Sequence, residues 1–372
     1  MSNPRSTLAA RLRALDPAAL PSVAIGFDGF VDEMIRVVGE RRSLSDYSAV
    51  PTIADFGALV SRAAGHSSLR EIVVTAVHAG GCAVNMGDGL AALGVPVDAF
   101  ATLGEPAHPA FEPVTRRFRG TRSWGREPGR TLAYEFSDGK LMFSSVAQLA
   151  ELTPARAAGL LADGAYARAC GNAGLIALTD WSLYPHMTEV WRFLQHEVYA
   201  HLTHHPRFFI DLVDPSGRTE TDILAMLGAL RDFDSAGPLT LGLNGNEANT
   251  LARLLHLPPC EHTVAGSSLP LAASLRAKLG VSEVVIHHIK SAAVSAPDGD
   301  AVRLGPYCAQ PKKSTGAGDR FNSGYALGAL LGLSPDERLL CACAGSGFFV
   351  REARSASVSE LAGFLDGPAW LS

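Results

Sequence analysis

Closely spaced glycines and a carboxylate stand together in residues 313–321, Lys-Ser-Thr-Gly-Ala-Gly-Asp-Arg-Phe. Apolar residues recur at helical spacing after this run, so Gly316, Ala317 and Gly318 are expected at the start of a helix. The first turn of a helix has unpaired N–H groups and a partial positive charge, and glycines let a phosphate approach them closely. Asp319, the next residue, can accept the proton of a hydroxyl that attacks a phosphoryl group. The run therefore predicts phosphoryl transfer, although a glycine-rich helix cap that binds nothing has the same short pattern.

Apolar runs and helical patterns alternate along the chain, which predicts an α/β fold with helices on both faces of a mostly parallel sheet. Several runs are continuously apolar, as expected of strands that are buried on both faces. The expected central strands are residues 23–27, 71–77, 95–103, 174–178, 208–213, 239–243 and 283–289, and the expected helices include 82–93, 188–201, 219–230 and 246–255.

Two segments interrupt this alternation. Residues 119–145 are expected to form a polar hairpin, with Asp138 and Gly139 at the positive φ angles of a tight turn. Residues 30–55 combine a β-like stretch with an irregular polar segment. We expect both segments to form a small β lid inserted in a single domain of residues 1–372, because large α/β domains reach this length.

Residues 316–321, Gly-Ala-Gly-Asp-x-Phe at the start of a helix, resemble the second signature of the PfkB, or ribokinase-like, carbohydrate kinases. The resemblance implies a three-layer α/β/α sandwich that transfers the γ-phosphoryl group of ATP to a hydroxyl of a sugar-like small molecule. It also implies Mg²⁺ as cofactor, Asp319 as general base, and the amides of residues 316–318 as catalytic groups. Ser314 and Thr315 would then lie beside the nucleotide.

The run of residues 79–94 resembles the family's first signature, a Gly-Gly turn followed by an asparagine at the start of a helix. The resemblance implies that Gly80, Gly81 and Asn85 bind the hydroxyls of the phosphate acceptor. Two glycines let the backbone pass close to a ligand, and an amide offers both a donor and an acceptor to a polyol. A helix that is entered through a flexible turn would account for the same residues.

Two acids follow the first expected strand, at Asp28 and Asp32. In the family, an acid near the end of this element binds hydroxyls of the acceptor. Asp32 aligns best with that acid, and Asp28 is the second candidate. Either carboxylate could instead form a turn.

Asn244 and Glu247 directly follow the strand expected at residues 239–243, and they resemble the family's Asn-x-x-Glu motif. The resemblance implies that Glu247 orients the magnesium shell through waters, because Mg²⁺ gives up its water reluctantly. Asn244 would lie on the nucleotide side of the same site. An Asn/Gly turn that caps the following helix fits these residues as well.

Two lysines depart from the family's pattern. Lys313 stands where members commonly carry an aspartate that helps to form a monovalent-cation site. This departure suggests a tethered cation in place of the metal. Lys290 lies in the expected nucleotide loop and is a candidate phosphate contact, with a solvated loop lysine as the alternative.

Composition narrows the partners to small molecules. The 32 basic and 37 acidic residues give a net charge of −5 without long runs, so nothing here suggests the basic surface that nucleic acid requires. No apolar stretch approaches the roughly 20 residues that span a bilayer, which favours a cytoplasmic protein without a membrane partner. A lid with an exposed sheet edge would favour pairing, so a homodimer through the lid is considered.

The expected activity is therefore that of a carbohydrate kinase, a phosphotransferase with an alcohol group as acceptor. A nucleoside, vitamin or ADP-dependent kinase shares the Gly-Ala-Gly-Asp loop and stays open as an alternative. A catalytically idle sugar-binding regulatory protein is the alternative from a different class, and the retained Asp319 and Glu247 argue against it. The sequence leaves the identity of the acceptor alcohol open.

Overall fold

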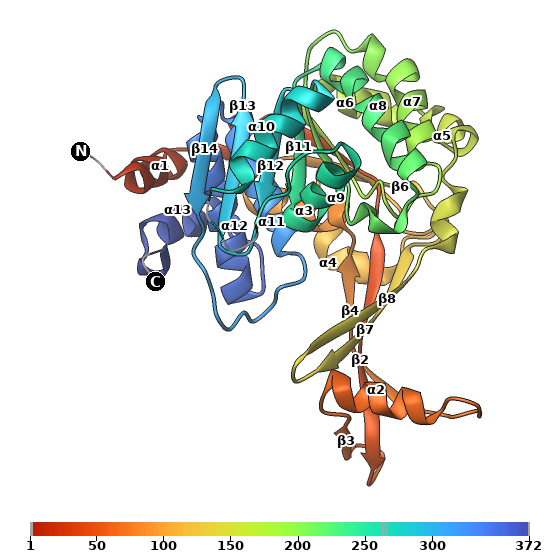
Figure 1. Cartoon of the computed structure of the whole chain (residues 1–372). Coiled ribbons are helices and arrows are strands. Elements are labelled where there is room, and N and C mark those ends of the chain that lie inside the picture. Colours follow the sequence, from red (N-terminus) through yellow and green to blue (C-terminus); the bar gives the residue numbers. More distant parts are fainter. Residues whose placement is uncertain (1–2, 262–263, 265, 371–372) are drawn as a thin grey trace.

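A nine-stranded sheet forms the centre of the main body in the computed structural model, which describes residues 3–261, 264 and 266–370 (Figure 1). All neighbouring strands are parallel except the last two pairs, β12 with β13 and β13 with β14. In spatial order the strands are β14 (Gly299–Leu304), β13 (Ser291–Ala296), β12 (Glu283–His287), β11 (Leu239–Asn244), β10 (Arg207–Asp211), β9 (Ala173–Thr179), β1 (Ser22–Gly26), β5 (Val97–Ala101) and β6 (Gly120–Ser123).

Helices cover both faces of this sheet because successive side chains of a strand point to opposite faces. Ala24 and Ile176 pack in one hydrophobic cluster, whereas Val23 and Leu175 pack in the other. The first cluster includes α6 (Ala165–Asn172), α7 (Met187–Glu197), α8 (Glu220–Ala236), α9 (Gly245–Leu254) and α10 (Ser268–Leu279). The second includes α1 (Pro4–Arg13), α3 (Cys82–Ala92), α11 (Ala317–Leu330), α12 (Pro335–Glu352) and α13 (Val358–Asp366). The predicted three-layer α/β/α sandwich is confirmed.

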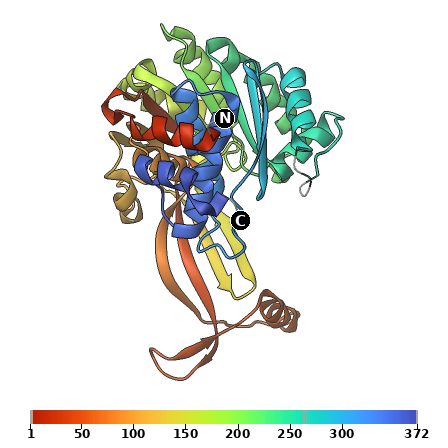
Figure 2. The same cartoon turned by 90° about the vertical axis from the view of Figure 1, so that its left-hand side faces the viewer.

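A smaller sheet stands away from the main body as an arm, which we call the lid (Figure 2). Its strands run in the order β3 (Tyr47–Ala49), β2 (Phe30–Arg41), β7 (Gly129–Phe136) and β8 (Gly139–Ser145), and β4 (Ile72–Gly80) pairs with β2. The helix α2 (Ile53–Arg62) packs on this sheet through Phe56, whose ring lies 5.8 Å from Tyr134 and 5.5 Å from Phe136.

Three sequence expectations differ from the structure in this region. Residues 71–77 were expected in the central sheet, but they belong to β4 of the lid, where most of the strand is half-exposed or exposed. Residues 120–123 form β6 and extend the main sheet, so the hairpin comprises only β7 and β8. Asp138 does not adopt a positive φ; its carboxylate accepts a hydrogen bond from the Ile53 N–H at 2.9 Å and so supports the start of α2.

The sequence also missed a pair of strands. The run expected as one strand over residues 283–289 ends at His287, and Lys290 lies in the tight connection to β13. β13 and β14 then form an antiparallel edge of the main sheet. Among the described residues, no helix is long and apolar enough to cross a membrane.

Candidate active site

Five acids gather where the parallel strands end, as expected of ligand sites in open α/β sheets. They act on one another electrostatically, and burial raises the pKa of each carboxyl group above its ordinary value. The five are Asp28 after β1, Asp180 after β9, Asp211 at the end of β10, Glu247 in α9 and Asp319 in α11.

The glycine turn before α11 has the geometry that the sequence predicts. Gly316 has a φ of 91°, in the left-handed region, and α11 begins at Ala317. A Cβ atom on Gly316 would lie 2.9 Å from the Arg320 guanidinium, so this position also requires the small residue. The Ala317 N–H donates to the Ser314 carbonyl at 3.0 Å, which closes the turn and engages that N–H within the loop.

Asp319 is the buried carboxylate of this turn, with an exposed fraction of 7%. Burial is the main cause that raises its pKa to about 7, and the charges of Asp211 and Asp28 add to this effect. The Arg320 guanidinium and a hydrogen bond from the Cys82 thiol oppose the rise in pKa. A carboxyl group with a pKa near neutrality is a stronger base than an ordinary aspartate, and about half of it is ionised at a pH near 7.

Asp28 and Asp32 have different surroundings. Asp28 is fully buried, and its carboxylate accepts hydrogen bonds from the Cys82 N–H, from the Ala83 N–H at 2.8 Å and from the Thr179 hydroxyl at 2.6 Å. These partners make Asp28 the cap of α3. Asp32 lies on β2 and faces a cavity of about 340 Å³ between the lid and the main body, which we call the lid cavity.

The first signature contributes to the same place. A methyl group at Gly80 would overlap the Asp32 carboxylate, so the glycine leaves room for that side chain. Gly81 has a φ of 96° and starts α3. Asn85 lies in the first turns of α3, with its amide nitrogen 3.7 Å from the position of a Cβ atom on Gly316. The two signatures, more than two hundred residues apart in the sequence, therefore meet in space.

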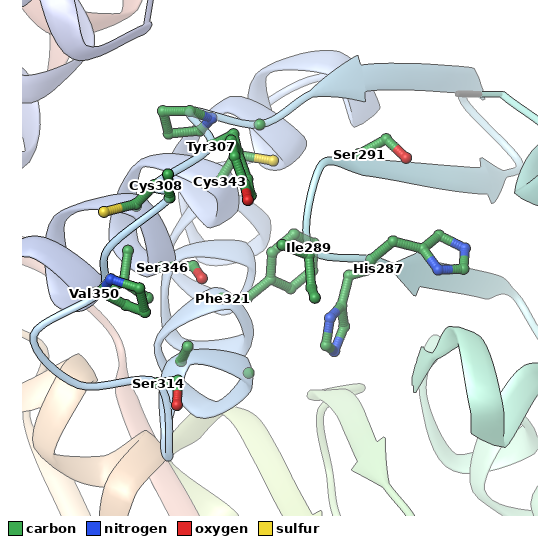
Figure 3. Close-up of a pocket in the computed structure, with 18 residues that line it drawn as sticks. His287, Ile289, Ser291, Tyr307, Cys308, Ser314, Phe321, Cys343, Ser346 and Val350 are labelled. Carbon is green, nitrogen blue, oxygen red and sulfur yellow. The ribbon is translucent and has the colours of Figure 1, made fainter. Parts of the chain in front are cut away.

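A second cavity of about 420 Å³, the loop cavity, is lined by the first turns of α11 (Figure 3). Phe321 and His287 form part of its wall, with ring centroids 4.8 Å apart. The other labelled residues come from the connection after β12, the loop after β14 and helix α12: Ile289, Ser291, Tyr307, Cys308, Ser314, Cys343, Ser346 and Val350. Sequence reasoning named only Ser314 among these, because the others carry no motif.

The segment of residues 313–318 separates the two cavities. Ser314, Ala317 and Gly318 line the loop cavity, whereas Lys313 and Thr315 line the lid cavity. Thr315, expected beside the nucleotide with Ser314, therefore lies on the opposite side of the segment from Ser314.

Lys290 lies between Ile289 and Ser291, two residues that line the loop cavity. Asn244 lies at the start of α9. The Lys290 ammonium packs over the Tyr307 ring at 4.6 Å from its centroid. Asn244 caps α9: its side-chain oxygen accepts from the N–H groups of Asn246 at 2.9 Å and Glu247 at 3.0 Å. The Glu247 carboxylate in turn accepts from the Asn244 backbone at 2.7 Å and side-chain amide at 2.6 Å.

The acids fit a magnesium ion that is held largely by a substrate's phosphates. Within the described ranges, no group of three or more acidic, histidine or cysteine side chains could enclose a metal ion. Both oxygens of Glu247 already accept hydrogen bonds. This arrangement suits contact with a hydrated Mg²⁺ through water, because the ion retains several of its waters.

Comparisons with known proteins identify the family of this chain. The model of the family described as prokaryotic ketohexokinase matches residues 6–368. A ketohexokinase of Haloferax volcanii is 30% identical over 350 residues, which are 93% of this chain and 91% of that protein.

Solved structures share the fold. A ribokinase of Thermotoga maritima has a TM-score of 0.62 at 15% identity and covers 94% of this chain and 100% of its own. An Arabidopsis thaliana ribokinase in complex with ribose and ATP has a TM-score of 0.62 at 18% identity, with 94% and 99% coverage. The resemblance found in the sequence is confirmed: this chain is a carbohydrate kinase of the PfkB type, and it belongs to the prokaryotic ketohexokinase family.

Proposed function

We propose that the chain is an ATP-dependent ketohexokinase, which transfers the γ-phosphoryl group of MgATP to a hydroxyl of a ketohexose. The observation that carries this proposal is the buried Asp319 carboxylate at the glycine turn, with one cavity on each side of the preceding segment. The similarity to a ketohexokinase along nearly the whole chain supports the choice of acceptor.

In the proposed mechanism the nucleotide occupies the loop cavity and the ketohexose occupies the lid cavity. Asp32 and Asn85 bind hydroxyls of the sugar, and Asp319 takes the proton of the hydroxyl that attacks the γ-phosphorus. The new oxygen–phosphorus bond forms as the bond to ADP breaks, and first-turn amides of α11 stabilise the charge on the phosphoryl oxygens. Glu247 would orient the water shell of a Mg²⁺ ion bound with the nucleotide, and that ion would supply positive charge to the phosphates.

The lid supplies much of the wall of the proposed sugar site. Asp32 and Met34 come from β2, His78 from β4, and Ala133 and Met142 from β7 and β8. Movement of the lid toward the main body would exclude water, which otherwise competes with the sugar as acceptor.

An acceptor screen tests the proposed activity directly. The purified protein is given MgATP with ketohexoses, aldohexoses, ribose, a nucleoside or sugar phosphates, and formation of ADP and phosphorylated product is measured. We expect kcat/KM for ketohexoses to be at least roughly tenfold higher than for the other classes of acceptor. A site that forms hydrogen bonds to particular hydroxyls rejects molecules that lack them. Preference for a nucleoside, use of ADP as donor, or binding without turnover would each contradict the proposal and support the corresponding alternative.

Asp319 gives a prediction about pH. The base must be ionised, so kcat/KM should fall as the pH decreases through about 7, the pKa that burial gives to this carboxyl group. Asp319→Asn keeps the shape of the side chain and should lower kcat by roughly 10²- to 10⁴-fold, the usual contribution of a general base. An activity that stays constant down to pH 5, or a variant with near-normal kcat, would remove Asp319 from this role.

Gly80 gives a prediction about the acceptor. In Gly80→Ala the added methyl group displaces the Asp32 carboxylate, so the KM for the sugar should rise by roughly 10- to 100-fold, the loss of a charged hydrogen bond. The KM for ATP should change little. Gly57→Ala in α2 is the matched control, because a Cβ atom there meets nothing within 4 Å. Equal effects of the two substitutions would show that Asp32 does not contact the sugar.

We also propose that two chains pair through their lids. β4 is an edge strand of the lid, and Ile72, Val74 and Val77 on it are 43%, 45% and 47% exposed. Apolar side chains on an open edge favour association with another strand. Sedimentation should therefore give twice the mass of one chain, and Val74→Lys with Val77→Lys should yield monomers. A monomeric parent protein at micromolar concentration would contradict the pairing.

A further inference from the structure

The half-buried side chain of Lys313 has no ion pair with a described residue, unlike three other cations around the lid cavity and the glycine turn. Arg320 pairs with Asp88 at 2.7 Å, Lys140 with Glu135 at 2.8 Å and Lys312 with Glu352 at 3.4 Å. For Lys313, no ion pair with a described residue is found, although the charge of Asp32 acts on it from the lid cavity. Burial and the nearby Arg320 charge lower the pKa of the Lys313 ammonium. A partly desolvated cation without a partner costs free energy, which a bound anion would recover.

The same side chain is held beside the glycine turn. The Lys313 ammonium lies 5.7 Å from the centre of the Phe349 ring, and the Arg320 guanidinium lies 4.5 Å from that centre. The Phe349 ring edge is 3.5 Å from the position that a Cβ atom on Gly316 would occupy. The Phe349 ring is thus close to both cations and to the turn that precedes Asp319. Asp88 pairs with Arg320, so Lys313 is the cation at this point that has no ion pair with a described residue.

Lys313 also lies on the acceptor side of the turn. It lines the lid cavity together with Asp32, while Ser314 and Gly318 line the loop cavity. A cation in this place would meet a phosphoryl group as it leaves the nucleotide and approaches the sugar. The amides of α11 would meet the same group from the helix, so the two sources of positive charge complement each other.

We propose that Lys313 is a catalytic residue whose ammonium binds the phosphoryl group during its transfer, from the side of the lid cavity. This inference rests on the proposed phosphotransfer, but not on the identity of the alcohol. The bond from phosphorus to ADP breaks and the bond to the acceptor oxygen forms, while the acceptor's proton passes to Asp319. Lys313 stays protonated throughout and stabilises the charge that the phosphoryl oxygens carry between the two bonds.

Steady-state kinetics of Lys313→Met, Lys313→Arg and Lys312→Met test this proposal with whichever alcohol the parent enzyme phosphorylates. Lys313→Met should lower kcat by roughly 10²- to 10³-fold, the cost of losing one group that stabilises transition-state charge, with little change in either KM. Lys313→Arg keeps the charge and should recover part of that loss. Lys312→Met is the matched control for charge at the lid cavity. Lys312 also lines this cavity, but its ammonium is already paired with Glu352, so the kcat of this variant should stay close to that of the parent.

Two further measurements separate the outcomes. Ethylammonium added to Lys313→Ala should restore part of kcat, because a small cation can occupy the space of the lost ammonium. Calorimetry should show weaker binding of ADP with Mg²⁺ and aluminium fluoride, a mimic of the transferring phosphoryl group, to Lys313→Met, with unchanged binding of ADP alone.

Several results would overturn the proposal. A higher KM for the alcohol with unchanged kcat would make Lys313 a contact of the acceptor, and a higher KM for ATP alone would make it a contact of the bound nucleotide. Equal losses in Lys312→Met would indicate only the general charge of the cavity rim. If the parent enzyme phosphorylates an alcohol other than a ketohexose, the proposed function fails while the Lys313 comparison proceeds with that alcohol. If it phosphorylates none, the aluminium fluoride measurement decides.

Discussion

Burial of a carboxylate beside the positive end of a helix is the constraint on which the site depends. Exclusion of water from Asp319 raises its pKa to about 7, which suits the proposed role of general base, but it also makes the ionised side chain costly to bury. The positive groups nearby reduce that cost. Arg320 follows Asp319 directly, and its own position is fixed by Asp88 and by the Ser355 hydroxyl at 3.1 Å. Burial therefore makes Asp319 more basic and at the same time destabilises the folded chain, and the charge of Arg320 reduces both effects.

A short segment before α11 separates the two cavities in which we propose that the substrates bind. Ser314 faces the cavity between α11, α12 and the β12–β13 connection, whereas Lys313 and Thr315 face the cavity under the lid. Neither side alone contains every group that the proposed transfer needs. The main body contributes Asp319 and the helix amides, and the lid contributes Asp32 and most of the wall around the sugar. Chemistry is thus expected only when the lid lies over an occupied site, which protects ATP from hydrolysis.

Local patterns predicted those parts of the molecule that depend on nearby residues. Continuous apolar runs located the buried strands, and the glycines around residue 316 located the start of α11 because that turn needs their backbone freedom. The same apolar composition misplaced β4, since a run of valines and an isoleucine suits an exposed lid strand as well as a buried one. Residues such as Tyr307 and Cys343 could not be found, because only the packing of distant loops and helices brings them to one cavity.

Asp28 and Asp32 show the same limit within the site. They are four residues apart and identical in type, so the sequence could only rank them by alignment. In the structure the two acids differ in their hydrogen-bond partners. The Asp28 carboxylate accepts hydrogen bonds from the start of α3 and from Thr179, whereas the Asp32 carboxylate faces a cavity. Asp28 nevertheless affects the acceptor site, because the helix that it caps carries Asn85.

The two signatures act together because α3 and α11 are packed unusually closely. A methyl group on Gly89 of α3 would overlap the Ser323 hydroxyl of α11. That hydroxyl can donate its proton to the Asp319 carbonyl at 2.7 Å or to the Met86 carbonyl of α3 at 3.0 Å. The buried pair of Asp88 and Arg320 joins the same two helices. A shift of one helix would therefore move the other, and Asn85 would keep its place relative to Gly316. The spacing between Asn85 and the turn before Asp319 is thus determined by helix packing in the main body, whereas Asp32 belongs to β2 and would move with the lid.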